Sequence, residues 1–151
     1  MLSQEKILVV EDNELNRTML VEILSGQYAT LEAENGQAAL DILQTHTDDV
    51  ALILLDIIMP VMDGYTFLDI LKKDSQLSLI PVIIMTQNAS EDAEVAALSH
   101  GATDFIPKPY RPQVILHRVA SIIHLRETAS MINQFRYDQL TGLYSKEFFY
   151  Q

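Results

Sequence analysis

Three short apolar runs, separated by segments with helical spacing, constrain the fold of this chain more than any other feature. They are residues 6–12 (KILVVED), 50–56 (VALILLD) and 80–86 (IPVIIMT), and two of them end in acids. Continuous apolar runs of this length are typical of strands buried on both faces. Weaker strands are predicted at 28–32 and 103–106, where short apolar stretches are flanked by Gly or Asn.

Segments with helical spacing lie between these strands. They occupy residues 13–26, 35–46, 64–73 and 90–101, and a last one begins near Arg111. In the first, Leu15, Met19 and Ile23 recur every four residues before Gly26, a residue type that often ends helices. Strand and helix therefore alternate five times. This order predicts an α/β fold in which helices cover both faces of a five-stranded parallel sheet.

The composition narrows the class of protein. Of the 151 residues, 48% are hydrophobic and 21% are charged, as in a globular chain with one ordinary domain and a short appendage. The apolar runs are shorter than the ~20 residues that span a bilayer, and the N-terminus lacks the features of a secretory signal. We therefore expect a cytoplasmic protein.

The charge balance and the lack of cysteine exclude several functions. Ten basic and 21 acidic side chains leave a net charge of −11. Because this charge repels phosphate backbones and anionic lipid surfaces, we expect neither nucleic acid nor a membrane as a partner. A chain without cysteine cannot form disulfides or use thiolate chemistry, and it cannot hold zinc through cysteine.

Acidic side chains follow two strands that such a sheet places side by side. Glu11 and Asp12 end the first run, and Asp56 ends the third strand. Because open α/β sheets hold their ligands at the carboxyl ends of the strands, the three carboxylates are expected to converge there. Like charges in a small cleft repel each other unless a cation lies among them, and oxygen ligands suit Mg²⁺. The alternative for a Glu-Asp pair before a helix is capping.

A hydroxyl and an ammonium group are expected at the same edge. Thr86 ends the fourth strand, and Lys108 follows the fifth. Each has an ordinary explanation alone, because threonine is common in strands and lysine on surfaces. Together with the acids they supply a nucleophilic carboxylate, a metal site, a hydroxyl donor and a fixed cation. This set favours phosphoryl transfer to aspartate.

The stretches ILVVEDN, LLDIIMPVMDG, IIMT and FIPKPY, in this order and spacing, resemble the receiver domain of bacterial two-component response regulators. The resemblance implies that Asp56 is the phosphoacceptor and that Mg²⁺ is held by Glu11, Asp12, Asp56 and the backbone carbonyl of Ile58. It also implies that Thr86 and Lys108 contact the phosphoryl group, and that Thr86 and Phe105 form the conformational switch.

The same resemblance implies a flavodoxin-like, doubly wound sheet of order 2-1-3-4-5 and a cis bond between Lys108 and Pro109. Two positions depart from the family pattern. Phe105 stands where many relatives carry Tyr, so the ring has no hydroxyl. Gln87 follows Thr86 where Ala is usual, which places a longer side chain near the site and leaves the lifetime of the phosphoryl group open.

The last helical segment runs past the end expected of a compact domain, to about Arg136. Its apolar residues trace a seam: Ile115, Ile122, Leu125, Ala129 and Ile132. Two interpretations are open, a coiled coil that joins two copies into a homodimer and one amphipathic helix packed on its own domain. We therefore expect a receiver domain at 1–124 and a helical linker at 125–136.

Residues 137–149 (YDQLTGLYSKEFF) resemble the opening of GGDEF-type diguanylate cyclase domains. The resemblance implies that 137–151 is the truncated start of an output domain. Ser145, Lys146 and Glu147 replace the usual Asn-Arg-Arg, and the alternative is a tail with a chance likeness.

We therefore expect a signal receiver, itself not an enzyme, that takes phosphate from a histidine kinase or phosphotransfer protein. It would control a C-terminal output domain, expected to be a diguanylate cyclase. The alternatives are a degenerate receiver used only for protein interaction, a receiver with another output, and a flavin-binding module. A phosphatase of the haloacid dehalogenase type would need an acid two residues after its nucleophile, where this chain has Ile58.

Overall fold

The structure is a computed structural model, and it describes residues 5–57, 59, 61–87, 90–109, 111–125 and 127. Its strands form one parallel sheet and are β1 Lys6–Val10, β2 Ala29–Ala33, β3 Val50–Asp56, β4 Val82–Thr86 and β5 Asp104–Pro107. The strand order is β2-β1-β3-β4-β5, which confirms the predicted flavodoxin-like sheet. The two weaker strands begin and end one residue later than the sequence indicated.

The helices lie within the segments that were predicted from helical spacing in the sequence. They are α1 Glu14–Leu24, α2 Gly36–Thr45, α3 Gly64–Lys73, α4 Glu91–Ser99 and a last helix at 112–125. A side chain caps each of the first four by accepting a backbone N–H three residues on, and the caps are Asn13, Asn35, Asp63 and Ser90. Such caps satisfy donors that the first helical turn leaves unpaired. The short 3₁₀ turn η1 Leu77–Leu79 was not predicted.

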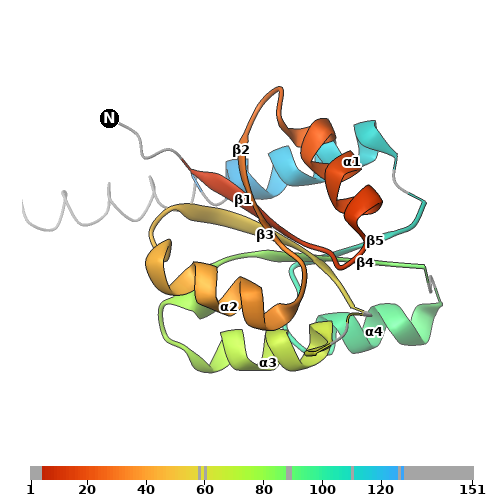
Figure 1. Ribbon diagram of the computed structural model, residues 1–151. Coiled ribbons are helices and arrows are strands. Elements are labelled where there is room, and N and C mark those ends of the chain that lie inside the picture. Colours follow the sequence, from red (N-terminus) through yellow and green to blue (C-terminus); the bar gives the residue numbers. More distant parts are fainter. Residues whose placement is uncertain are drawn as a thin grey trace, which may run out of the picture. The chain divides into compact units, whose positions relative to one another are not determined.

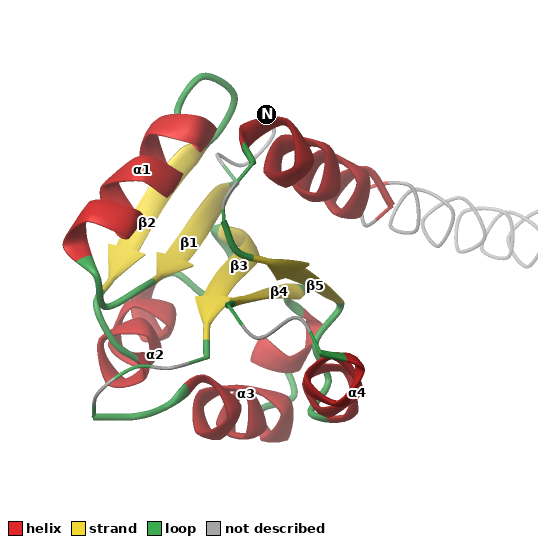
Figure 2. Cartoon of the chain, turned by 90° about the vertical axis from the view of Figure 1, so that its right-hand side faces the viewer, coloured by secondary structure: helices red, strands yellow, loops and turns green. Residues whose placement is uncertain are grey.

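Helices cover both faces of the sheet, as expected for a doubly wound fold. Figures 1 and 2 show α1 on one face and α2, α3 and α4 on the other. All seven residues of β3 are buried because this strand is central and covered on both sides. The carboxyl ends of β1, β3, β4 and β5 point the same way, so the residues that follow them share one edge.

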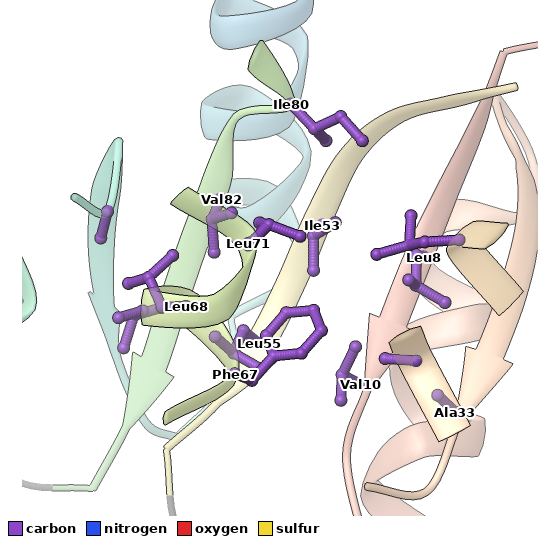
Figure 3. Packing of buried hydrophobic residues seen from close by; sticks show 14 of the residues in the cluster. Leu8, Val10, Ala33, Ile53, Leu55, Phe67, Leu68, Leu71, Ile80 and Val82 are labelled. Carbon is purple, nitrogen blue, oxygen red and sulfur yellow. The ribbon is translucent and has the colours of Figure 1, made fainter. Parts of the chain in front are cut away.

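The main core lies between the sheet and the helices α2 and α3. Figure 3 shows side chains of β1, β3 and β4 packed against α3, and those that it labels include Leu8, Val10, Ile53, Leu55, Val82, Phe67, Leu68 and Leu71. Phe67 is fully buried, and truncating a buried phenylalanine to alanine costs about 3–5 kcal/mol. This packing holds the edge that carries the acids in place.

The face that α1 buries differs from the stripe indicated by the sequence. Leu20 and Leu24 are fully buried, whereas Leu15 is 73% exposed and Met19 is 39% exposed. Both pairs have a four-residue spacing, so periodicity alone cannot distinguish them. The choice is made by how α1 packs on β1 and β2. The exposed pair leaves an apolar surface on α1.

The last helix continues at least to Leu125. Its buried residues are Ile115, Val119 and Ile123, while Leu125 is 66% exposed. Of the other predicted seam residues, Ile122 is half-buried, whereas Ala129 and Ile132 lie outside the described residues, as does the segment 137–151. The chain divides into two units after His117, inside this helix. In the part of the chain that is described, no helix has the length and apolar character needed to cross a membrane.

Candidate functional site

The polar residues singled out in the sequence meet at the carboxyl edge of the sheet. Pairing in register places Val10 beside Leu55, Asp56 beside Met85, and Thr86 beside Pro107. Glu11 and Lys108 each follow the last residue of their strand. Neighbouring parallel strands thus bring together residues that are up to 97 positions apart in the chain.

Three carboxylates form a cluster at this edge. Each of Glu11, Asp12 and Asp56 offers an oxygen, and these atoms all lie within 4.8 Å of one another. Glu11 is 1% exposed and Asp56 is 5% exposed, whereas Asp12 is open to solvent. An exclusively oxygen donor set with an open side fits Mg²⁺, which keeps several waters when it binds to proteins.

Local hydrogen bonds position Glu11. Its N–H donates to the carbonyl of Ala33 on β2 over 3.0 Å, which continues the pairing of β1 with β2. Its carboxylate Oε2 accepts the backbone N–H of Asn13 at 3.2 Å. Asn13 in turn caps α1 through Asn16. The capping role that was an alternative for the acidic pair therefore belongs to Asn13.

Lys108 links the acids across the sheet. Its Nζ lies 3.4 Å from Asp56 Oδ1 and 3.4 Å from Glu11 Oε1. The backbone N–H of Lys108 donates to the carbonyl of Thr86 at 2.7 Å. The peptide bond between Lys108 and Pro109 is cis, which confirms the prediction. Lys108 therefore supplies a mostly buried cation beside two buried carboxylates.

The electrostatics of the cluster favour binding of a proton or a cation. The pKa of Asp56 is raised from 3.8 to about 6. Burial is the largest cause and the negative charge of Glu11 adds to it, whereas the charge and hydrogen bond of Lys108 oppose the rise. Asp56 is thus ionised at pH 7 at an energetic cost, which a bound cation would reduce.

The loop after β3 approaches the strand end very closely. Gly64 donates its N–H to the carbonyl of Ile57 at 2.8 Å. A Cβ atom at Gly64 would lie 2.7 Å from both the Asp56 carbonyl oxygen and the Ile57 Cα, so only glycine fits here without a backbone shift. The predicted metal ligand Ile58 lies outside the described residues.

The two predicted switch residues are both buried. Thr86 is the last residue of β4. Phe105 lies on β5, pairs with Ile84 of β4 and belongs to the main core. Gln87 follows Thr86 and is exposed at the edge. Phe105 therefore has a place in the core, and its role as the switch aromatic stays a prediction.

Comparison with known proteins decides the family. A family model described as "Response regulator receiver domain" matches residues 7–120. This chain belongs to the response regulator receiver family.

A curated protein and a solved structure also match most of the chain. The transcriptional regulatory protein CpxR of Escherichia coli (strain K12) is 35% identical over 119 residues, which are 78% of this chain and 49% of CpxR. The chain therefore spans about half the length of this relative. The solved receiver domain of a signal transduction histidine kinase from Syntrophus aciditrophicus is 35% identical, with a TM-score of 0.72, and the match covers 80% of this chain and 90% of that one.

A second solved structure carries a further domain. It is described as a probable two-component system response regulator/GGDEF domain protein and is 26% identical, with a TM-score of 0.76. The match covers 82% of this chain and 51% of that protein. About half of that protein thus lies outside the match.

Sequence reasoning missed two residues of this receiver site. Arg17 on α1 donates from Nη1 to the backbone carbonyl of Glu11 at 2.8 Å, and Gly64 permits the close approach of α3 to Asp56. A feature of the sequence marks each of these two residues. Arg17 lies one helical turn after the Asn13 cap, and Gly64 follows an Asp in an Asp-Gly turn. Neither signal identifies the contact partner.

Proposed function

We propose that this receiver domain accepts a phosphoryl group on Asp56 from a phosphohistidine of a histidine kinase or phosphotransfer protein. The observation that carries the proposal is the placement of Asp56. It is buried at the end of the central strand, 3.4 Å from the Lys108 ammonium and within 4.8 Å of two further carboxylates. A structural ion pair alone would not require a third carboxylate, that of Asp12, beside the two that Lys108 contacts.

In the proposed reaction, a carboxylate oxygen of Asp56 attacks the phosphorus of the donor. The P–N bond of the phosphohistidine breaks, its electron pair stays on the imidazole nitrogen, and an aspartyl phosphate forms. Lys108 can pair with an oxygen of the transferred group, because its Nζ already lies beside the Asp56 oxygen. Positioning and charge neutralisation of this kind provide most of the catalysis in phosphoryl transfer.

Receiver domains bind Mg²⁺ at their acidic site, and the donor set here fits that ion. Glu11, Asp12 and Asp56 would hold it, and the Ile58 carbonyl stays a predicted ligand. When bound, Mg²⁺ neutralises charge on the phosphoryl oxygens and on the carboxylates. The exposed side of the cluster, at Asp12, leaves room for water and for the incoming group.

The switch is proposed to connect the site to the surface. The Thr86 hydroxyl would move toward the phosphoryl group, and Phe105 would turn into the space that Thr86 leaves. Both residues occupy the last two strands of the sheet, β4 and β5, beside α4. The surface formed by these elements would therefore change on phosphorylation.

The donor protein is proposed to dock on the exposed apolar residues of α1. Leu15 and Met19 lie on the helix that begins two residues after Asp12. A partner that brings a phosphohistidine to Asp56 must contact surface near the acidic edge, and exposed apolar side chains there favour such a contact.

We further propose a diguanylate cyclase as the output and a homodimer as the active form. The likeness of 137–149 to GGDEF domains supports the output, as does the receiver/GGDEF architecture in the description of one similar structure. Beryllofluoride, a mimic of aspartyl phosphate, is expected to shift the chain toward a dimer. Light scattering over a concentration series tests this, and equal dissociation constants with and without beryllofluoride would exclude dimer control.

Intact mass spectrometry tests the phosphoacceptor. The protein is incubated with acetyl phosphate and Mg²⁺, and one phosphoryl adduct is expected. Asp56→Asn should abolish the adduct, whereas Asp48→Asn, which changes an exposed aspartate, should retain it. An adduct that persists in Asp56→Asn contradicts the assignment, and a wild-type protein without an adduct favours the degenerate receiver.

A further inference from the structure

Arg17 makes two hydrogen bonds that join α1 to the acidic edge of the sheet. Its Nη1 donates to the backbone carbonyl of Glu11 at 2.8 Å, and its Nε donates to Glu32 Oε1 on β2 at 3.2 Å. The Arg17 side chain is 16% exposed, whereas Glu32 is half exposed. The planar guanidinium group thus uses two of its donors in different directions, which a lysine ammonium cannot reproduce with the same geometry.

The Glu11 carbonyl belongs to the peptide group that links Glu11 to Asp12. Its orientation therefore influences where the Asp12 side chain points. On the other side of Glu11, the backbone N–H is already bonded to Ala33. Arg17 consequently holds the second of the two peptide groups that flank Glu11, at the point where regular pairing of β1 has ended.

We propose that Arg17 is a positioning residue for divalent-cation binding, and that Glu32 orients its guanidinium group. Arg17 would hold the Glu11–Asp12 peptide so that both carboxylates face Asp56. This inference rests on the proposed Mg²⁺ site. Partners of metal ligands that fix their orientation typically change metal affinity 10- to 100-fold when they are removed.

Charge and positioning predict opposite effects, which makes the inference testable. A cation near a metal site repels Mg²⁺, so loss of Arg17 would strengthen Mg²⁺ binding if charge were its only influence. If Arg17 positions the ligands, its loss weakens Mg²⁺ binding although a repelling charge is gone. Arg17→Lys separates the two effects, because it keeps the charge and loses the two-directional geometry.

The experiment is a calorimetric Mg²⁺ titration of metal-free protein, at a temperature well below the melting point of every variant. Arg17→Met is expected to raise the Mg²⁺ dissociation constant about tenfold, and Arg17→Lys to raise it severalfold. Glu32→Ala should produce a smaller increase, since the Glu11 carbonyl contact remains available. Lys73→Met is the matched control, because it removes one positive charge at the carboxyl end of α3, the end opposite Gly64. Its Mg²⁺ dissociation constant should stay within about twofold of that of wild type.

Two outcomes distinguish failure of this inference from failure of the proposed metal site. If Arg17→Met and Arg17→Lys bind Mg²⁺ as tightly as wild type or more tightly, while Asp12→Asn loses binding, the metal site stands and the role of Arg17 is refuted. If Asp12→Asn also binds like wild type, the proposed Mg²⁺ site is itself wrong. Arg17→Lys preserves the test if Arg17→Met does not fold.

Discussion

The Lys108 ammonium lies 3.4 Å from a carboxylate oxygen of Asp56, 52 positions earlier in the chain. Parallel pairing of β3 with β4 and of β4 with β5 brings these two residues to the same edge. Asp56 is buried and Lys108 is mostly buried, and each has its charge partly balanced by the other.

Replacing Lys108 with methionine is expected to raise the pKa of Asp56 above about 6 in metal-free protein. The charge and hydrogen bond of Lys108 favour the ionised form, and their loss leaves burial and the Glu11 charge unopposed. Carbon-13 NMR of the aspartate carboxyl groups measures the change. Lys73→Met is the control, and an equal Asp56 pKa in both variants would contradict the assigned influence of Lys108.

Asp56→Asn is expected to stabilise the metal-free protein above about pH 6. The folded pKa of Asp56 is raised above 3.8, so its stabilising contribution is present below that pH and is lost as pH rises to about 6. Above about pH 6, the wild-type protein has lost roughly 2–3 kcal/mol of its free energy of unfolding through this group, and a further rise in pH does not change that loss. Urea denaturation at pH 5 and pH 8 measures it.

In that experiment, the advantage of Asp56→Asn over wild type should be larger at pH 8 than at pH 5. Asp48→Asn is the matched control, and as an exposed substitution it should change stability by less than about 0.5 kcal/mol. A variant Asp56→Asn that is no more stable than wild type at pH 8 would show that ionised Asp56 carries no folding cost.

Mg²⁺ is expected to raise the free energy of unfolding by about 2.7 kcal/mol at a hundredfold excess over its dissociation constant. The ion would relieve repulsion within the acidic cluster of Glu11, Asp12 and Asp56. Asp12→Ala should melt higher than wild type without metal and should lose the response to Mg²⁺. Thermal melts test both parts, and an undiminished Mg²⁺ response in this variant counts against the site.

Gly64→Ala is expected to destabilise the protein by about 1–3 kcal/mol. The new Cβ would lie 2.7 Å from the Asp56 carbonyl oxygen, and the surrounding atoms are backbone that cannot turn aside. Gly26→Ala is the matched control, because no atom lies within 4 Å of the added Cβ, and it should be neutral or stabilising by up to about 1 kcal/mol. Equal stabilities of the two variants, measured by urea denaturation, would show that the β3–α3 loop adapts freely.

The sequence alone determined the α/β class and most of the site. Alternating apolar runs and helical segments predicted the parallel sheet, and parallel strands place their carboxyl ends at one edge. Residue type and position alone therefore predict that one site contains Glu11, Asp12, Asp56, Thr86 and Lys108. The strand order came from the family resemblance, because periodicity identifies strands but does not say which strands are neighbours.

Only the tertiary structure decided which face of α1 is buried, since Leu15 with Met19 and Leu20 with Leu24 have the same spacing and only docking on the sheet separates them. It also decided the contact of Arg17 with Glu11 and the close approach of Gly64 to Asp56. The raised pKa of Asp56 is likewise decided by the tertiary structure, because it depends on burial and on the nearby charge of Glu11. Contacts and burial arise from distances between distant parts of the chain, and residue type and spacing do not contain those distances.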